Sequence, residues 1–348
     1  MKHFRESRMN RNKNYTICVI KGDGIGIDVV SETLRLLDKL PISFDFMEAR
    51  AGYECYLDSG NPLPEETILS CKKASAILFG AVTTPPNIKN YFSPIVRLRK
   101  ILNLFANVRP IFSLPLPHLR QNIDFIIVRE NTEGLYQGVE RVVRGGVVAE
   151  RLITRIASKN VINFAFQMVE KQKRRKVTLV HKANILRLSD GLFLKTAQRI
   201  AQKYPNVVFE DMLVDSCAAN IIKKPEYFDV IVTTNMFGDI LSDEAAALVG
   251  GLGIAASANF GKNYALFEPV HGSAPKHQGK NTVNPVACFF AAVMMLEYLS
   301  ERQIADKLHR SILDVMKSNC VTIDLGGHTS SSEVTDEVIK IYKRDYNR

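Results

Sequence analysis

The chain has 348 residues, of which 46% are hydrophobic, and a formal net charge of +10. This length allows two domains or one large domain with a sizeable core. No apolar run approaches the roughly 20 residues that span a bilayer, and the first residues lack the apolar core of a secretory signal, which argues against a membrane or secreted protein. We expect residues 1–14 to be a disordered basic leader.

The basic excess gathers in this leader, in KQKRRK (171–176) and in KRDYNR (343–348). It lacks the aromatic interleaving of a nucleic-acid stacking platform, so we expect no nucleic acid or membrane as partner, and arginines reserved for an acidic small molecule instead. The six cysteines are scattered, without a CxxC pair, and have mostly apolar neighbours. They predict reduced, buried thiols in a cytoplasmic protein.

Short β-branched runs alternate with longer helical patterns along the chain. The pairs of strand and helix patterns are YTICVI (15–20) with DVVSETLRLLDKL (28–40), ASAILFG (74–80) with PIVRLRKILNLF (94–105), KVTLVHK (176–182) with DGLFLKTAQRIAQKY (190–204), and FDVIVTTN (228–235) with DILSDEAAALVGG (239–251). This alternation predicts an α/β fold with parallel strands covered on both faces. Residues 124–156 depart from the pattern and resemble strands joined by glycine turns, as in an arm off the main sheet.

Several strand ends carry residues suited to chemistry. KGDGIGIDVV (21–30) follows the first strand, but its glycines do not match the G-x-G-x-x-G fingerprint, so a phosphate cradle and a tight turn explain it equally well. RENTEGLY (129–136) and HKAN (181–184) also follow strands, where ligands bind preferentially in layered α/β proteins. A lysine there accepts a proton when burial favours its neutral form, although a solvated lysine is commoner.

Two further features suggest a ligand site. Asp239 and Asp243 lie four residues apart on one helical face, either as acids near a helix N-terminus or as half of a site for a divalent cation. FEPVHGSAPKHQGKNTVNP (267–285) is a long loop without helix or strand period, and such loops are usually functional or disordered. Because its neighbours look well folded, we favour a functional loop.

Together these stretches resemble the β-decarboxylating dehydrogenases, the family of isocitrate, 3-isopropylmalate, homoisocitrate and tartrate dehydrogenases. The resemblance runs from about residue 15 to near 340, through GDGIG, LRKILNLFANVRP, RENTEGLYQG, HKANI, GDILSDEAA, EPVHGSAP and NP, in that order. It implies an isopropylmalate dehydrogenase-like α/β fold of two domains with a central, mostly parallel sheet and a dimerisation arm. Residues 15–103 and 253–348 would form a discontinuous cofactor-binding domain, and residues 104–252 a smaller domain with the arm.

The resemblance also implies roles for single residues. Tyr136 and Lys182 would be the acid/base pair. Ser93, Arg99, Arg109 and Arg129 would bind the substrate. Asp215, Asp239 and Asp243 would bind Mg²⁺ or Mn²⁺, and Lys182 and Asp215 would reach the site of the other subunit in a homodimer. Residues around the cofactor would be Thr83, Thr84, His271, Gly272, Ser273, Ala274, Lys276 and Asn284.

The implied reaction is the oxidation of a 2-hydroxy-3-carboxy acid with hydride transfer to NAD or NADP, followed by loss of carbon dioxide. Lys276 stands where NAD-dependent members carry an aspartate, which favours NADP, whereas residues 323–338 resemble NAD-type endings. Ser93 favours isocitrate or homoisocitrate, whereas Ile95 and Val96 would suit the isopropyl group of 3-isopropylmalate. The choice of cofactor stays open, and we favour isocitrate or homoisocitrate as the substrate, with 3-isopropylmalate as the alternative. A non-catalytic regulatory subunit is a further alternative, but such a paralogue is expected to have lost part of the catalytic set.

Overall fold

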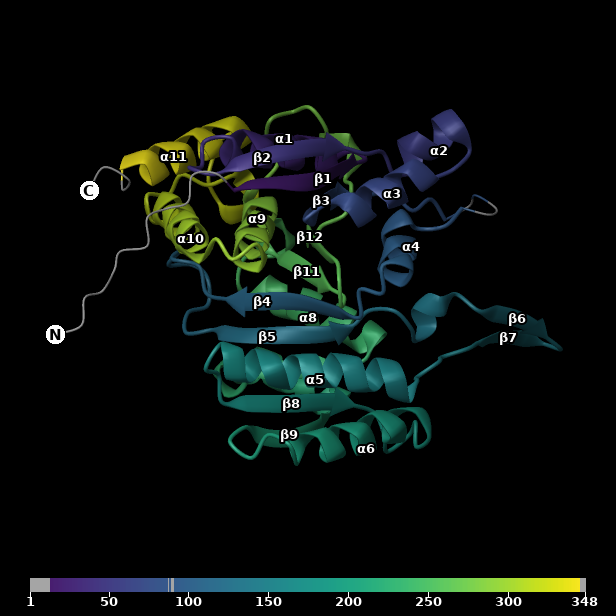
Figure 1. Cartoon of the computed structure of the whole chain (residues 1–348). Helices are drawn as coiled ribbons and strands as arrows, with labels where there is room; N and C mark the ends of the chain where they lie inside the picture. Colours follow the sequence, from purple (N-terminus) through teal and green to yellow (C-terminus); the bar gives the residue numbers. More distant parts are fainter. Residues whose placement is uncertain (1–12, 87, 89–90, 345–348) are drawn as a thin grey trace.

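A sheet of ten strands runs through the part of the molecule that the structure describes (Figure 1). The computed structural model describes residues 13–86, 88 and 91–344, and the counts below refer to them. The strands lie in the order β2-β1-β3-β12-β11-β4-β5-β10-β8-β9. Their bounds are β1 Asn14–Gly22, β2 Ser43–Glu48, β3 Ala76–Ala81, β4 Ala106–Phe112, β5 Asp124–Glu130, β8 Lys176–His181, β9 Val208–Leu213, β10 Val230–Thr233, β11 Ala256–Phe260 and β12 Ala265–Pro269.

Parallel pairing prevails in this sheet. β2, β1, β3 and β12 are parallel to their neighbours at one end, and β5, β10, β8 and β9 at the other. Only the central pairs β12–β11, β11–β4 and β4–β5 are antiparallel. The predicted α/β fold with a mostly parallel sheet is confirmed. Residues 104–252 supply five adjacent strands of this sheet, in the order β4, β5, β10, β8 and β9. The division into two domains along that line stays a prediction.

Eleven α-helices of the described chain accompany the sheet. Their bounds are α1 Ile25–Leu37, α2 Tyr53–Ser59, α3 Glu65–Lys73, α4 Pro94–Ile101, α5 Arg155–Lys171, α6 Ser189–Ala201, α7 Val214–Lys223, α8 Asn235–Leu248, α9 Val286–Tyr298, α10 Arg302–Lys317 and α11 Ser331–Arg344. Short 3₁₀ turns are η1 Leu135–Gln137, η2 Pro225–Tyr227, η3 Leu252–Ile254, η4 Pro275–His277 and η5 Ile323–Leu325. Helix α4 is shorter than predicted, because the chain turns at Asn103 with a φ of 48° and β4 begins at residue 106.

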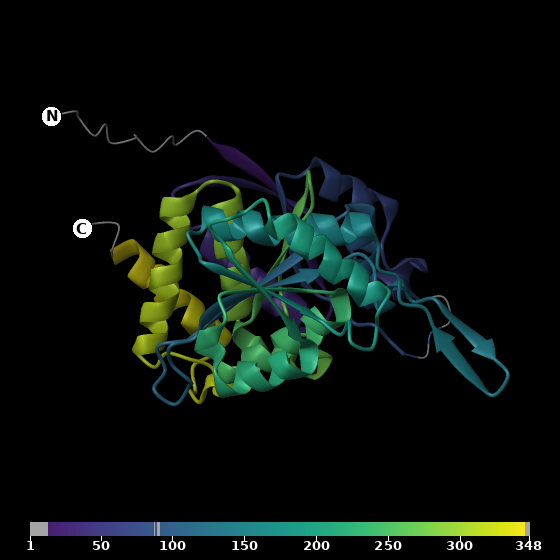
Figure 2. The same cartoon turned by 90° about the horizontal axis from the view of Figure 1, so that it is seen from below.

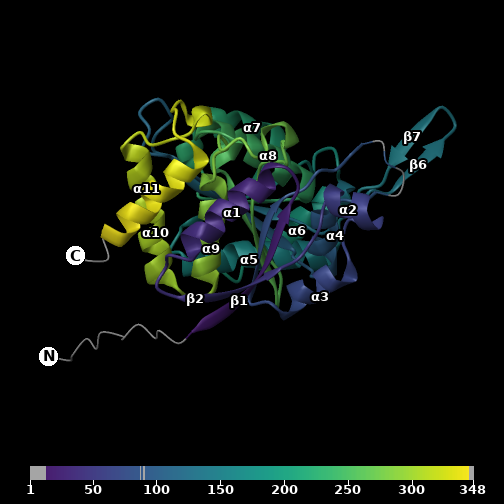
Figure 3. The ribbon, with the colours of Figure 1, turned by 90° about the horizontal axis from the view of Figure 1, so that it is seen from above.

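Side chains that alternate along β10 bury the sheet on both faces. Val230 and Val232 pack in one apolar cluster with Phe166 of α5. Ile231 points to the opposite face and belongs to the cluster that contains Leu241 of α8. This period of two is that of a strand covered on both sides. In the view of Figure 3, α7 and α8 accordingly lie above α5 and α6.

Helix α9 is apolar on every side, as expected for a helix inside the protein. It contacts β12, β11, α10 and α1, and ten of its residues are buried. No helix in the described part of the chain is both long and apolar enough to cross a membrane. The apolar surface of α9 is therefore buried by its own neighbours.

The predicted arm is a hairpin of β6 (Glu140–Val143) and β7 (Gly146–Ala149), which projects away from the main sheet (Figures 1 and 2). The arm is shorter than the stretch 124–156 from which it was predicted. The buried apolar residues of β5 join the main sheet, and α5 begins at Arg155.

The sequence predicts a disordered basic leader at the N-terminus and reduced, buried cysteines. Residues 1–12 of the predicted leader lie outside the described residues, and Asn14 already begins β1. All six cysteines are free; five are buried, and only Cys320 is partly exposed, as predicted from their apolar neighbours.

Candidate active site

Asp239 and Asp243 lie on α8, and the guanidinium group of Arg109 bridges them. Arg109 Nη2 is 3.1 Å from Asp239 Oδ1, and its Nη1 is 2.9 Å from Asp243 Oδ1. Helix α8 begins at Asn235, after Thr234 at the N-cap, so Asp239 lies in the second turn. The alternative of acids in the N-terminal turn is therefore wrong. A cation does lie between the two carboxylates, but here it belongs to an arginine on β4.

Arg129, at the end of β5, is 1% exposed and closes the other side of Asp239. Its Nη1 forms an ion pair with Asp239 Oδ1, and its Nε and Nη2 donate to Asn235 Oδ1 at 3.1 and 2.7 Å. A Cβ atom on Gly238 would lie 2.6 Å from Arg129 Cγ, so this close approach requires glycine. Burial and the charge of Arg109 lower the pKa of Arg129 to about 10.

Tyr136 completes this group from the turn η1. Its hydroxyl donates to Asp239 Oδ2, and the Arg129 guanidinium carbon lies 4.9 Å from the centre of its ring. Lys100 of α4 holds the backbone of the turn by donating to the Tyr136 carbonyl at 3.0 Å. Burial raises the pKa of Tyr136, which keeps its hydroxyl protonated at neutral pH.

The surroundings shift the pKa values of the two aspartates of α8 in opposite directions. Burial acts to raise the pKa of Asp239, but the charges of Arg129 and Arg109 outweigh it and lower this pKa below its ordinary value. At Asp243 burial prevails over Arg109, and the pKa is raised. Asp239 is thus the more firmly held anion, because two guanidinium groups surround it.

Arg99 belongs to α4, and Ser93 directly precedes this helix. Ser93 is the N-cap residue, but its side chain makes no capping hydrogen bond. Arg99 is buried and forms an ion pair with Glu268 of β12 at 2.7 Å. Its Nε is buried without a hydrogen-bond partner in the described structure. A buried donor without a partner is costly, so Arg99 Nε fits an anionic ligand.

Lys182 and Asp215 pair with each other. Lys182 Nζ forms an ion pair with Asp215 Oδ1, and their side chains are 28% and 61% exposed. The Lys182 amide donates to Asp190 Oδ2 at 2.7 Å, which fixes the turn after β8. Among the described residues, no hydrogen bond or ion pair connects this pair to Asp239 or Tyr136. The ion pair with Asp215 is thus the contact that holds the Lys182 ammonium group within one chain.

The loop after β1 meets two segments predicted to surround the cofactor. The Asp23 carboxylate accepts a hydrogen bond from the Thr83 amide at 2.7 Å and from two amides at the start of α2. Thr83 Oγ1 lies 2.6 Å from Ser273 Oγ, and the Ile25 amide donates to the Ser273 carbonyl at 2.7 Å. At Gly24, with a φ of 55°, a Cβ atom would lie 2.1 Å from that carbonyl. The glycine-rich turn thus permits close packing of two backbones.

Most other predicted cofactor residues lie along the loop from His271. Nδ1 of His271 lies 3.0 Å from the Gly272 carbonyl, and Nε2 is buried without a hydrogen-bond partner among the described residues. Burial lowers the pKa of His271 and favours the neutral ring. Lys276 in η4 and Ala274, at a φ of 33°, are exposed to solvent, and so is Thr84. The last predicted member, Asn284, donates to Asp324 Oδ2 at 2.9 Å.

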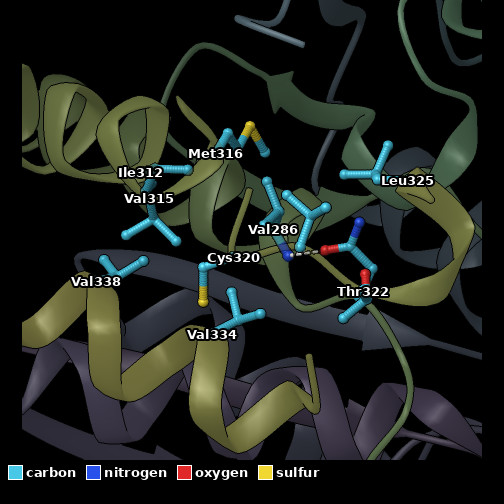
Figure 4. Close-up of a pocket in the computed structure, with 11 residues that line it drawn as sticks. Val286, Ile312, Val315, Met316, Cys320, Thr322, Leu325, Val334 and Val338 are labelled. Atoms are coloured by element: carbon cyan, nitrogen blue, oxygen red, sulfur yellow. Dashed lines mark hydrogen bonds between the residues drawn. The ribbon is translucent and has the colours of Figure 1, made fainter. Parts of the chain in front are cut away.

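An apolar hollow lies beside Asn284. Its amide oxygen accepts a hydrogen bond from the Val286 amide at 3.0 Å. Figure 4 shows Leu325, Thr322 and Val286 on one side of this hollow and Val334 on the other. Residues of α9, α10 and α11 thus line an apolar hollow next to the end of the loop.

The chain matches the family described as isocitrate/isopropylmalate dehydrogenase over residues 16–338. The chain belongs to this family. Its relatives include the homoisocitrate dehydrogenase of Methanocaldococcus jannaschii, which is 48% identical over 94% of this chain and 98% of its own. The 3-isopropylmalate dehydrogenase of Methanothermobacter thermautotrophicus is 46% identical over 94% and 98%. The crystal structure of isocitrate dehydrogenase from Methylococcus capsulatus superposes with a TM-score of 0.91 at 38% identity, over 94% of this chain and 99% of that one.

The chain is thus a decarboxylating dehydrogenase of the isocitrate/isopropylmalate dehydrogenase family, whose members act on hydroxy acids and use NAD(P) and a divalent metal. Carboxylates such as Asp239 and Asp243 are the oxygen ligands that Mg²⁺ and Mn²⁺ prefer. Within the described residues, however, no three acidic, histidine or cysteine side chains lie close enough to hold a metal. The chemistry of the pair fits half of the family's metal site. The buried, unpartnered His271 Nε2 likewise fits a polar group of a nucleotide.

Several residues that shape this family site were missed in the sequence. Asp23 ties the glycine-rich turn to Thr83. Glu268 and Asn107 pair with Arg99 and Arg109, and Asn259 connects Glu268 to Asn107. The sequence did carry a signal for the last three, because Asn107, Asn259 and Glu268 interrupt apolar strand runs, where buried polar residues need a partner.

Proposed function

We propose that this dehydrogenase acts on isocitrate or homoisocitrate. The observation that carries the proposal is the convergence of Arg109, Arg129 and Tyr136 on the two acids of α8, with Arg99 Nε left unpaired nearby. Guanidinium groups bind carboxylates in a forked geometry, and a tricarboxylate would use all three arginines. The homoisocitrate dehydrogenase among the relatives supports the same substrate class.

A second candidate is 3-isopropylmalate, the substrate named for another relative. Ile95 and Val96 would then cover the isopropyl group. Ile95, however, packs against the apolar cluster that contains Leu98 and Ile77, so its side chain already takes part in the core. This leaves Val96 as the apolar group of that pair available to a ligand, and we prefer the tricarboxylates.

In the proposed reaction, Lys182 accepts the proton of the substrate hydroxyl, and Tyr136 donates a proton to carbon after carbon dioxide has left. The raised pKa of Tyr136 keeps that proton in place until then. Nicotinamide would accept the hydride. A dication held by Asp239, Asp243 and Asp215 of a second copy would act as a Lewis acid toward the substrate oxygens. Arg109 and Arg129 hold the carboxylates so that the reacting carbon stays in place.

Because no hydrogen bond or ion pair joins Lys182 to Tyr136 among the described residues of one chain, we propose a homodimer with shared sites. The β6–β7 arm presents Val142 and Val147, which are 86% and 64% exposed, and Leu188 beyond β8 is 91% exposed. Apolar side chains so exposed are typical of an interface with another copy. In such a dimer each Lys182 and Asp215 would serve the site of the other copy.

Mixing two inactive variants tests this arrangement. Tyr136→Phe and Lys182→Met each disable the site, but a mixed dimer would hold one site in which both residues are native. Random mixing makes half of the dimers mixed, and one of their two sites works, so about a quarter of the activity should return. The matched control is the variant that carries both substitutions on the same chain, taken through the same mixing procedure by itself. It should stay inactive. Equal activity of the mixture and of the separate variants would contradict shared sites.

Exposed Lys276 supports NADP, because an ammonium group near the adenosine would pair with a 2′-phosphate. Lys276→Asp is expected to raise the KM for NADP and to shift the preference toward NAD. The measurement is the ratio of kcat/KM for the two cofactors. An unchanged ratio would remove Lys276 from cofactor choice.

The substrate itself is tested by steady-state rates of the purified chain with isocitrate, homoisocitrate, 3-isopropylmalate and tartrate, against NAD and NADP, with Mg²⁺ or Mn²⁺. Turnover of 3-isopropylmalate alone would contradict the assignment based on Ser93. No turnover by the chain alone would favour the regulatory-subunit alternative, although Tyr136, Lys182 and the three proposed metal ligands are all present. A cytoplasmic location stays a prediction from the free thiols.

A further inference from the structure

Buried polar side chains connect two of the site arginines across the middle of the sheet. Arg99 Nη2 donates to Glu268 Oε1 at 2.7 Å, and the same oxygen accepts from Asn259 Nδ2 at 2.8 Å. Asn259 Oδ1 accepts from Asn107 Nδ2 at 2.7 Å, and Asn107 Oδ1 accepts from Arg109 Nε at 3.0 Å. An unbroken series of side-chain hydrogen bonds therefore joins Arg99 on α4 to Arg109 on β4.

The register of three strands produces this connection. Asn259 of β11 lies directly opposite Asn107 of β4 in an antiparallel pair, so both side chains are on one face. Leu266 of β12 is the other partner of Asn259, and Glu268 follows two residues later. Arg109 likewise follows Asn107 by two residues. Because side chains alternate with a period of two, all four polar groups share that face.

Asn259 is the junction of the network and uses every hydrogen bond of its carboxamide. Oδ1 also accepts from Asn131 Nδ2 at 2.8 Å, and Nδ2 also donates to the Leu266 carbonyl at 3.2 Å. The side chain is fully buried, so no solvent replaces a lost partner. A carboxamide offers two donor hydrogens and two acceptor lone pairs, and an apolar or purely acidic side chain cannot match both.

We propose that Asn259 is the positioning residue that sets the separation of Arg99 and Arg109, and with it the spacing at which substrate carboxylates are bound. This inference rests on the proposed function, in which both arginines bind the hydroxy acid. Asn259 acts through Glu268 on one side and through Asn107 on the other. The network uses Nη2 of Arg99 and Nε of Arg109, whereas the two Nη atoms of Arg109 point to Asp239, Asp243 and Ser242 of α8.

Steady-state kinetics of the full chain test the proposal. Asn259→Leu should raise the KM for the hydroxy acid about ten-fold or more, because two buried amides and Glu268 lose a partner, while the KM for the cofactor changes less than about two-fold. Asn259→Asp places a second carboxylate beside Glu268 and should act in the same way. Combining N259D with E268Q restores one acid and one amide between the arginines, and should recover most of the loss.

Ser311→Ala is the matched control, because it removes a buried side-chain hydrogen bond on α10, outside the network. It should lower the thermal midpoint without changing either KM. If N259L raised both KM values equally, or if the N259D/E268Q pair failed to recover activity, the positioning role would be wrong while the proposed function stood.

Failure of the proposed function gives a different result. If the native chain turned over no hydroxy acid, calorimetric binding of tricarballylate, a plain tricarboxylate, would replace kinetics. A ten-fold weaker binding by N259L, with recovery in N259D/E268Q, would still support the positioning role. Equal binding by the native chain and N259L, or no binding by the native chain, would overturn it.

Discussion

Glu133, beside the site, should make the stability of the protein depend on pH. Its side chain is 4% exposed, and its Oε1 accepts a hydrogen bond from the Thr154 amide at 2.8 Å, where α5 begins. Burial raises the pKa of Glu133 from 4.5 to about 7, although the hydrogen bonds of Thr154 lower it in part. The folded state therefore binds this proton more tightly than the unfolded chain. Its contribution to stability is complete below about pH 4.5 and is lost as the pH rises through about 7.

The size of the effect follows from these values. A pKa that changes from 4.5 to about 7 corresponds to about 3.4 kcal/mol, and solvent screening of the charge reduces this to about 2 kcal/mol. At about 2.1 cal/mol/K per residue, the unfolding entropy of 348 residues is about 0.7 kcal/mol/K. A difference of about 2 kcal/mol is then about 3 °C in the thermal midpoint.

Glu133→Gln keeps the acceptor for Thr154 and removes the titration. Scanning calorimetry of both proteins at pH 5 and pH 8 should show that the midpoint of the variant, relative to the native protein, rises by about 3 °C between the two pH values. Other titrating groups cancel in this difference. Glu140→Gln on the exposed arm controls for the loss of one negative charge. A difference that does not change with pH would refute the effect of burial on Glu133.

Three further outcomes are expected. Gly24→Ala should destabilise the protein and weaken cofactor binding measured by calorimetry, whereas Gly60→Ala, also at positive φ but with no atom within 4 Å, should show only the backbone strain of about 1 kcal/mol. Arg109→Met should raise the KM for the hydroxy acid about 100-fold, whereas Arg174→Met, which also loses two aspartate partners, should change stability alone. Addition of Mn²⁺ should raise the thermal midpoint of the native protein but not of Asp239→Asn, and an equal rise would place the metal elsewhere.

The order of elements could be read from the sequence because hydrophobic period depends on local backbone geometry. β10 and α8 show where the hydrophobic period located an element correctly and where it did not. The strand was found at its observed place, but the helix begins at Asn235, four residues before the predicted start. The first turn of α8 shows no hydrophobic helical period, because its residues serve Arg129. Asn235 accepts hydrogen bonds from this arginine, and Gly238 leaves room for its side chain.

The candidate site was only partly accessible to sequence reasoning. The spacing of Asp239 and Asp243 left a divalent-cation site as one of two alternatives, and it did not indicate that Arg109, from a strand distant in sequence, would lie between them in the folded chain. Nor could spacing reveal that Lys182 forms its ion pair with Asp215. These contacts depend on which strands become neighbours, and local patterns do not encode that.

The sequence by itself determined the α/β class, the arm and the residue types available for catalysis, because each follows from short-range period and composition. The tertiary structure alone decided which charges are compensated. By placing β11 between β4 and β12, it brought Asn259 between Asn107 and Glu268 and so joined two arginines that are ten residues apart in the chain but lie on different elements. Buried polar groups must find partners wherever the fold provides them, and only the folded chain shows where that is.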